Sequence, residues 1–154
     1  MSYRVRAAVA ADIDCLVAFN HAMASESEGK PLDVSRLKAG LIHLLKHSAD
    51  GYYLIAEHAN GEAAGALMLT FEWSDWRNGR FWWIQSVYVR PEYRRQGVYR
   101  CLHDHVRNRA LGDAECCGLR LYVERENSGA QATYRGMGMV ETHYRLYEEA
   151  FERS

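Results

Sequence analysis

The residues best suited to chemistry form a basic, glycine-containing stretch in the middle of the chain. Residues 89–100 read Val-Arg-Pro-Glu-Tyr-Arg-Arg-Gln-Gly-Val-Tyr-Arg, which is typical of the end of a buried strand, a turn and the start of a helix. The N–H groups of a helix's first turn lack intrahelical partners and carry partial positive charge. Gly97 lets the main chain approach a ligand closely, and the arginines add formal charge that suits a diphosphate. The alternative is an ordinary strand-to-helix connection with solvated arginines.

A second candidate segment lies further along the chain. Residues 121–139 read as a strand followed by a short helix, with Asn127 at the helix start, Tyr134 within it and Gly138 just past its end. Together the two segments resemble the GNAT superfamily of N-acetyltransferases. Its first signature is Arg/Gln-x-x-Gly-x-Gly/Ala, and its second is a strand followed by Asn-x-x-Ala-x-x-x-Tyr-x-x-x-Gly. The matching residues are Arg94, Gly97, Asn127, Ala130, Tyr134 and Gly138.

The resemblance implies a site for acetyl-CoA as co-substrate. The residues that would surround its pyrophosphate are Arg94, Arg95, Gln96, Gly97, Val98, Tyr99 and Arg100. By the same resemblance, the strand backbone at Val87 and Val89 would pair with the pantetheine arm like an added strand. Asn127 would hydrogen-bond that arm, cap a helix, or do both. Tyr99 departs from the family pattern, which has glycine or alanine at this position.

Acetyl transfer to an amine needs a proton acceptor for the nucleophile and a proton donor for the departing thiolate. Tyr134 matches the position that the superfamily uses for the donor; its alternative is a tyrosine that packs a helix onto the sheet. Where the diamine and polyamine acetyltransferases carry Glu-Asp on the central strand, this chain has Gln85-Ser86, and glutamine is not a base at neutral pH. Glu26 and Glu28 are the candidate acceptors because, by resemblance, their loop borders the amine site. Otherwise both are simply solvated.

Residues 71–79, Phe-Glu-Trp-Ser-Asp-Trp-Arg-Asn-Gly, resemble the aromatic hairpin of the diamine and polyamine N-acetyltransferases. Aromatic faces and carboxylates suit a cationic amine through cation–π attraction and charge pairing. The candidates for substrate binding are Glu72, Trp73, Asp75, Trp76 and Gln85. The alternative is a rigid hairpin whose tryptophans cover the core, which is the favoured interpretation for Trp82 and Trp83.

Hydrophobic periodicity predicts the elements that must position these residues. Alternating or apolar runs, bounded by Asn-Gly and other turn residues, predict strands over residues 3–7, 52–58, 64–73, 80–89, 119–123 and 139–147. The predicted helices span residues 12–23, 33–47, 97–111 and 128–137. This order matches the superfamily's fold along nearly the whole chain. The resemblance therefore implies one mixed α/β domain over residues 1–154, with a twisted sheet of six to seven strands, about four helices, and a splay between the two central parallel strands.

Composition and charge restrict the class of protein. The 154 residues fit one domain, and 48% hydrophobic with 25% charged residues is ordinary for a water-soluble globular protein. A net charge of −1 provides no general attraction to nucleic acid or to an acidic membrane. The seven histidines and four cysteines lack metal-ligand spacing, so no metal is expected. Neither a signal peptide nor an apolar run of about 18 residues is present, so the expected location is the cytoplasm.

The sequence therefore predicts an acetyl-CoA-dependent N-acetyltransferase that acts by direct attack in a ternary complex. Its acceptor would be a primary amine of a small molecule, either a diamine or polyamine or an amino-acid-like compound; a protein lysine or N-terminus is the second acceptor class. The alternative of another kind is a CoA-binding regulatory module without catalysis. The resemblance also implies a homodimer, to which an aromatic surface near Trp73, Trp76 and Phe81 would contribute.

Overall fold

The computed structural model describes residues 3–27, 29 and 31–153. These residues fall into two compact units, one ending at Tyr122 and one beginning at Val123. Among the described residues, no helix combines the length and the apolar character needed to cross a bilayer. Glu28, one of the two candidate proton acceptors, lies outside the described residues. A single functional domain over residues 1–154 stays a prediction.

The first unit is built on a five-stranded mixed sheet. Its strands are β1 (Arg4–Ala7), β2 (Tyr52–Glu57), β3 (Ala63–Ser74), β4 (Gly79–Val89) and β5 (Cys116–Arg120). Its helices are α1 (Ile13–Ser27), α2 (Val34–Lys46) and α3 (Val98–Leu111), with short 3-10 turns η1 (Ala10–Asp12) and η2 (Pro91–Tyr93). The strands lie in the order β1-β2-β3-β4-β5, antiparallel from β1 to β4 and parallel between β4 and β5. Parallel neighbours need a crossover connection, and α3 provides it.

Both predicted Asn-Gly turns are confirmed. Gly61 has a φ of +90° between β2 and β3, and Asn78 has a φ of +48° between β3 and β4. Left-handed conformations are what tight hairpin turns require, and glycine and asparagine adopt them at low cost. The β3–β4 hairpin stays paired from Gly65↔Val89 to Ser74↔Gly79, so one long ribbon carries most of the aromatic residues.

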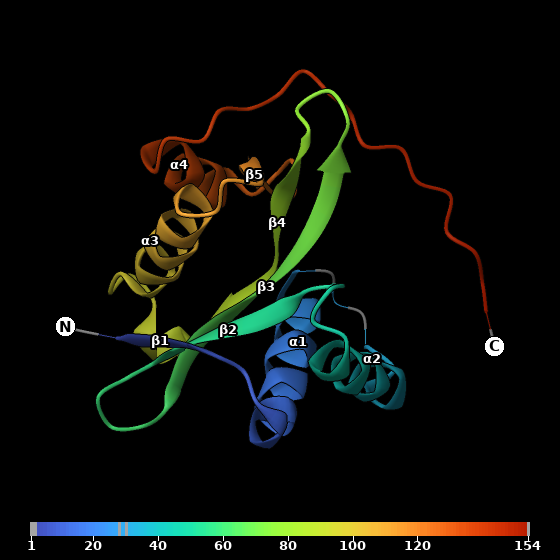
Figure 1. The fold of residues 1–154 in the computed structure, drawn as a ribbon. Coiled ribbons are helices and arrows are strands. Elements are labelled where there is room, and N and C mark those ends of the chain that lie inside the picture. Colours follow the sequence, from blue (N-terminus) through green and yellow to red (C-terminus); the bar gives the residue numbers. More distant parts are fainter. Residues whose placement is uncertain (1–2, 28, 30, 154) are drawn as a thin grey trace. The chain divides into compact units, whose positions relative to one another are not determined.

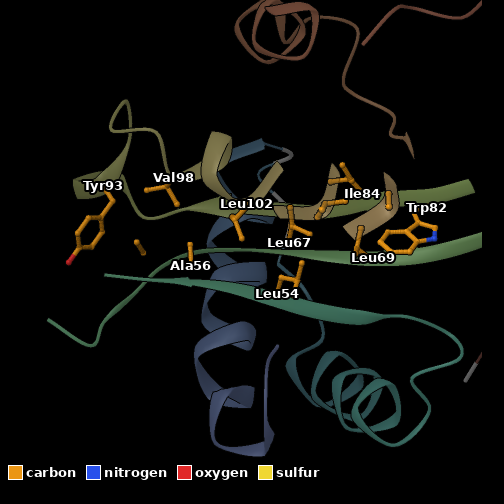
Figure 2. Packing of buried hydrophobic residues seen from close by; sticks show 12 residues of the cluster. Leu54, Ala56, Leu67, Leu69, Trp82, Ile84, Tyr93, Val98 and Leu102 are labelled. Atoms are coloured by element: carbon orange, nitrogen blue, oxygen red, sulfur yellow. The ribbon is translucent and has the colours of Figure 1, made fainter. Parts of the chain in front are cut away.

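Helices cover both faces of this sheet (Figure 1). On one face α3 packs its apolar side onto the strands; this core, shown in Figure 2, includes Leu54, Leu67, Leu69, Trp82, Ile84, Val98 and Leu102. On the opposite face α1 and α2 pack onto the same strands through Leu16, Phe19, Leu41, Tyr53, Ile55, Ala66 and Tyr88. Residues of β2, β3 and β4 on opposite faces thus supply two cores, as period-two patterning predicts for strands buried on both sides. Burial of Trp82 confirms the core interpretation for that tryptophan.

An ion pair fixes the start of α1 to the first strand. The Arg6 guanidinium donates to both carboxylate oxygens of Asp12 at 2.8 and 2.9 Å, and this holds the pKa of Asp12 below its usual range. Asp12→Asn is expected to lower the free energy of unfolding by about 1–2 kcal/mol at pH 7, because charge-assisted hydrogen bonds are lost. A carboxyl whose folded pKa is depressed stabilises the fold above its unfolded pKa of about 4, and loses this effect as pH falls further.

Chemical denaturation at pH 7 and pH 3 measures the effect. The control is Asp14→Asn, since the Asp14 carboxylate lies 3.6 Å from Lys38 in an exposed pair of little expected value. A difference between Asp12→Asn and the parent protein that is as large at pH 3 as at pH 7 would contradict the role of the ionised carboxylate.

The second unit contains the helix α4 (Ser128–Gly136) and no strand among its described residues. The predicted count of six to seven strands is therefore wrong, since the described residues hold five strands. Residues 139–147 alternate in polarity as a strand does, and Val140, Tyr144 and Leu146 are exposed. Residues 139–147 form no strand in the structure, because an alternating pattern becomes a strand only through hydrogen bonds to a neighbour.

Candidate functional site

The turn between η2 and α3 has the geometry of an anion cradle. Arg95 has a φ of +62° and Gly97, two residues later, a φ of +82° at the N-cap of α3. Arg94 before them is extended and Val98 after them begins α3. Successive residues in such a turn can direct their N–H groups toward one side of the chain and form an anion-binding concavity. Within the described part of the chain, no side chain caps α3. A Cβ on Gly97 would meet no atom within 4 Å, so the space in front of the turn is open.

Tyr93 anchors this turn to the core. The buried ring belongs to the core under α3, and its hydroxyl donates to Glu62 at 2.6 Å and accepts from Asn60 at 3.3 Å. The hydrogen bond to Glu62 raises the pKa of Tyr93. Gln96 closes the turn by donating to the carbonyl oxygen of Glu92 at 2.9 Å. The cradle is therefore held in shape by the protein itself, and a ligand would not have to order it.

The Arg94 side chain lies under the turn and not in the cradle. Its Nε donates to the carbonyl oxygen of Val89 at 2.9 Å, and its Nη2 donates to Glu26 at 2.8 Å. The Tyr88 hydroxyl donates to the other Glu26 oxygen at 3.1 Å. The resemblance places Arg94 among the residues around the pyrophosphate, whereas its side chain here ties the cradle to β4 and to the last turn of α1. Arg95 and Arg100 are exposed beside the cradle.

Glu26 is thus an ion-paired carboxylate. The Arg94 guanidinium, with a smaller contribution from the Tyr88 hydroxyl, holds the pKa of Glu26 below its ordinary value. A carboxylate with a lowered pKa is fully ionised at neutral pH but is a weaker proton acceptor than a free glutamate. Its role as proton acceptor stays a prediction, as does that of Glu28.

The side chain of Tyr99 is directed along α3. Its hydroxyl lies 3.0 Å from Nδ1 of His103, one helical turn later, and the two rings meet edge to face. His103 is 1% exposed, and burial lowers the pKa of its imidazole. The departure from glycine or alanine at Tyr99 therefore adds a ring alongside the helix, while the main chain at this position still belongs to the first helical turn.

Beyond its midpoint, β4 has an open edge. Its pairing with β5 ends at Trp83↔Arg120, whereas β4 itself continues to Val89. The N–H of Arg90 donates to Ala64 of β3, and successive N–H groups of a strand point to opposite edges. The N–H groups of Val89 and Val87 therefore point away from β3, toward the edge that β5 has left. These are the two backbone positions that the sequence suggests for pairing with a pantetheine arm.

The predicted amine-binding residues divide into two groups. Glu72 accepts from Nε1 of Trp83 at 3.0 Å and from Arg120 at 2.9 Å, and Gln85 donates to Thr70. Glu72 and Gln85 are therefore already engaged with neighbouring side chains.

Trp73 and Trp76, by contrast, are 59% and 89% exposed at the end of the β3–β4 hairpin. The Asp75 carboxylate lies beside them and accepts from the N–H of Trp76 at 2.9 Å. Phe81, which the sequence suggests as part of an exposed aromatic surface, is buried beneath the guanidinium groups of Arg77 and Arg120; that expectation is wrong.

The second unit holds the other two predicted residues. Asn127 is the N-cap of α4, since its Oδ1 accepts from the N–H of Ala130 at 3.1 Å, so its capping role is confirmed. Gly138, with a φ of +94°, follows the end of that helix, as the signature predicts. Tyr134 lies within α4, and burial raises the pKa of its phenol. Its hydroxyl is therefore protonated at neutral pH, which is the state that a proton donor requires.

Sequence reasoning missed the residues that support the cradle and the strand. Tyr93 and its partner Glu62 are 31 positions apart, and Tyr88 and Glu26 are 62 apart. Such contacts have no local sequence signal. Within the ranges that the structure describes, no three histidine, cysteine, aspartate or glutamate side chains gather as a metal site would require.

Comparisons with known proteins identify the family and the fold of this chain. The model of the acetyltransferase (GNAT) family matches residues 17–139. A crystal structure of a possible acetyltransferase from Clostridium difficile 630 is 40% identical, with a TM-score of 0.90 over 99% of this chain and 100% of that chain. A predicted acetyltransferase from Clostridium acetobutylicum, crystallised with acetyl-CoA, has a TM-score of 0.77 over 96% of both chains; at 20% identity this likeness concerns the fold alone.

Among characterised proteins, the thialysine N-epsilon-acetyltransferase of Bos taurus is 36% identical over 92 residues. The matched region covers 55% of this chain and 53% of the bovine protein, so the similarity spans about half the length of each.

Proposed function

This chain belongs to the GNAT family of acetyltransferases, and on that premise we propose that it transfers the acetyl group of acetyl-CoA to a primary amine of a small molecule. The main support is the preformed cradle, in which left-handed Arg95 and Gly97 precede the uncapped start of α3. Such a cradle fits a diphosphate, and the open edge of β4 beside it fits an extended pantetheine arm.

The residues of the chain would then act on the reacting groups as follows. When bound, acetyl-CoA supplies the thioester. The amine nitrogen forms a bond to the carbonyl carbon as the carbon–sulfur bond breaks, and an N–H of Val87 or Val89 would stabilise the negative charge that develops on the carbonyl oxygen. The departing thiolate takes a proton, for which Tyr134 is the proposed donor. Asn127 is proposed to position the pantetheine arm in addition to capping α4.

The attacking amine must be neutral. A lysine-like amine with a pKa of about 10.4 is about one part in 2,500 neutral at pH 7, which adds roughly 4.6 kcal/mol to the barrier. A group that accepts the amine proton therefore has a large effect on the rate. Glu26 and Glu28 are the proposed acceptors, either directly or through a water molecule.

The proposed acceptor class is a small cationic amine, either a diamine or polyamine or an amino-acid-like compound. Support comes from exposed Trp73 and Trp76 beside the Asp75 carboxylate, and from the partial similarity to a protein named for thialysine, an amino acid with a side-chain amine. A protein lysine or N-terminus is the second proposed acceptor. A homodimer is a separate proposal, for which the same exposed tryptophans are the candidate contact.

Two measurements test the proposed activity. Calorimetry should detect binding of CoA and acetyl-CoA to the purified protein. In a thiol-release assay with acetyl-CoA, at least one amine from a panel of diamines, polyamines and amino acids should be acetylated. Failure to bind CoA would overturn the proposal as a whole. Tight CoA binding with no turnover on any small amine, peptide lysine or N-terminus would support the regulatory module instead.

Trp76→Ala tests the amine site. We expect a two- to fivefold rise in KM for a cationic amine, since an exposed cation–π contact contributes about 0.5–1 kcal/mol. The KM for acetyl-CoA should not change. Steady-state kinetics with each substrate varied in turn makes the comparison, and the control is Phe151→Ala, which removes an exposed aromatic ring outside the hairpin. Equal effects of Trp76→Ala on both KM values would contradict a local role at the amine site.

A further inference from the structure

A β-bulge interrupts β4 just before the cradle. Ser86 and Val87 together oppose the single residue Leu67 of β3. Ile84 packs toward α3 before the bulge, whereas Val87 and Val89 pack toward α3 after it. Because side chains alternate between the two faces of a strand, one inserted residue moves every following side chain to the opposite face of the sheet. It also turns every following N–H group toward the opposite edge of the strand.

The direction of the N–H groups reverses in the same way. The N–H of Arg80 donates to Glu115, on the β5 side, and the N–H of Arg90, an even number of residues later, donates to Ala64, on the β3 side. An uninterrupted strand would send both to the same edge. Because of the bulge, the N–H groups of Val87 and Val89 point toward the open edge of β4. The proposed function requires this direction for pairing with the pantetheine arm.

The inserted residue is strained. Ser86 has a φ of +52°, in the left-handed region where a residue with a Cβ costs about 1–2 kcal/mol. Serine has no intrinsic preference for that region, unlike glycine. Such a conformation persists only where the surrounding structure determines it.

A buried polar network lies beneath the bulge. Burial raises the pKa of the Tyr53 phenol on β2, and the neighbouring Ser86 side chain opposes that rise as a hydrogen-bonding partner. Asn20 of α1 donates from Nδ2 both to the Tyr53 hydroxyl at 3.0 Å and to the carbonyl oxygen of Leu16 at 2.9 Å. Tyr53 and Asn20 are only 5% and 9% exposed, and an unsatisfied polar group at such depth costs about 1–3 kcal/mol. Asn20 and Tyr53 are hydrogen-bonded to each other, so the interaction that depends on the position of Ser86 is the one between its side chain and the Tyr53 phenol.

We propose that Tyr53 and Asn20 are positioning residues for acetyl transfer, which hold Ser86 in its left-handed conformation and so keep the N–H groups of Val87 and Val89 on the open edge of β4. The effect on catalysis rests on the proposed function. The left-handed conformation of Ser86 is a property of the protein without ligand. Neither Tyr53 nor Asn20 would touch either substrate, because both lie in the core between α1 and the sheet.

The test combines Tyr53→Phe with Ser86→Gly. In the parent protein, Tyr53→Phe should weaken CoA binding by about fivefold, because one buried hydrogen bond that opposes the strain is lost. Ser86→Gly should bind CoA within about threefold of the parent, since glycine adopts positive φ without strain. In the Ser86→Gly background, Tyr53→Phe should then have less than a twofold effect. Tyr52→Phe, on the neighbouring residue, serves as the control for loss of a tyrosine hydroxyl on the same strand.

The free protein gives a second readout. The three-bond coupling between the amide and α protons of residue 86 reports its φ, and hydrogen exchange reports the protection of the Val87 and Val89 amides. Tyr53→Phe should change all three values, and Tyr52→Phe should change none. Unchanged values in Tyr53→Phe, or an equal loss of CoA affinity with and without Ser86→Gly, would overturn the inference. If the parent protein binds no CoA, the proposed function fails, but the coupling and exchange values still decide whether Tyr53 holds the bulge.

Discussion

Tyr134→Phe is expected to lower kcat by about 10²- to 10³-fold while leaving the affinity for acetyl-CoA nearly unchanged. A positioned general acid contributes about 10²- to 10⁴-fold, and phenylalanine keeps the ring while removing the proton. Burial raises the pKa of the Tyr134 phenol, so the donor stays protonated throughout the neutral and mildly basic range. The measurement is kcat from thiol release at saturating acetyl-CoA and amine, together with calorimetry of CoA binding.

The pH profile adds a second criterion. Because the pKa of Tyr134 lies above the ordinary value of 10, deprotonation of this residue should reduce kcat only above about pH 10. Tyr147→Phe, in the exposed part of the same unit, is the control and should keep the parent rate. A Tyr134→Phe protein that retains more than half of the parent kcat would rule out Tyr134 as the acid, and would leave it as a residue that packs α4.

Gly97→Ala is expected to weaken CoA binding by roughly 30- to 150-fold, with a smaller effect on stability. A methyl group on Gly97 would project into the open space where the diphosphate must approach the main chain. Loss of one or two hydrogen bonds to a charged group removes about 2–3 kcal/mol of binding free energy. The strain of alanine at positive φ should cost about 1 kcal/mol of folding stability. Calorimetry and thermal unfolding measure the two effects separately.

The matched control is Gly61→Ala. Gly61 also has a positive φ, and a Cβ there would also meet no atom within 4 Å, but it lies in the turn between β2 and β3. It should show the same loss of stability and a far smaller change in CoA affinity. If both variants lose affinity equally, the effect comes from destabilisation of the fold and the cradle assignment is wrong.

Features encoded by neighbouring residues could be predicted from the sequence. The Asn-Gly turns, the glycine that begins α3 and the Asn127 cap all depend on conformational preferences within a few positions. The helices and the first five strands depend on periodicity, and their predicted bounds differ from the observed ones by only a few residues. The GNAT resemblance, carried by local signatures, agrees with the family match.

Features that depend on distant partners could not be predicted. The direction of the Arg94 side chain is set by Glu26, 68 residues away in the sequence. The sheet membership of residues 139–147 depends on a neighbouring strand, so an alternating pattern alone gave the wrong strand count. The bulge at Ser86 had no clear local signal, because apolar residues occupy both faces of β4; only the packing shows that the residues facing α3 are even-numbered up to Ile84 and odd-numbered from Val87.

The position of Arg94 has a consequence for how this loop can change in evolution. The Arg94 side chain is hydrogen-bonded to Glu26 and to the carbonyl oxygen of Val89. The cradle can therefore offer a phosphate mainly main-chain N–H groups, which nearly every amino acid carries. Substitutions at exposed Arg95, Gln96 or Arg100 would alter local charge but would not delete those donors. If the cradle binds a diphosphate as proposed, related chains could keep that binding while the side chains of their loops differ, provided that the residues allowing the left-handed turns are retained.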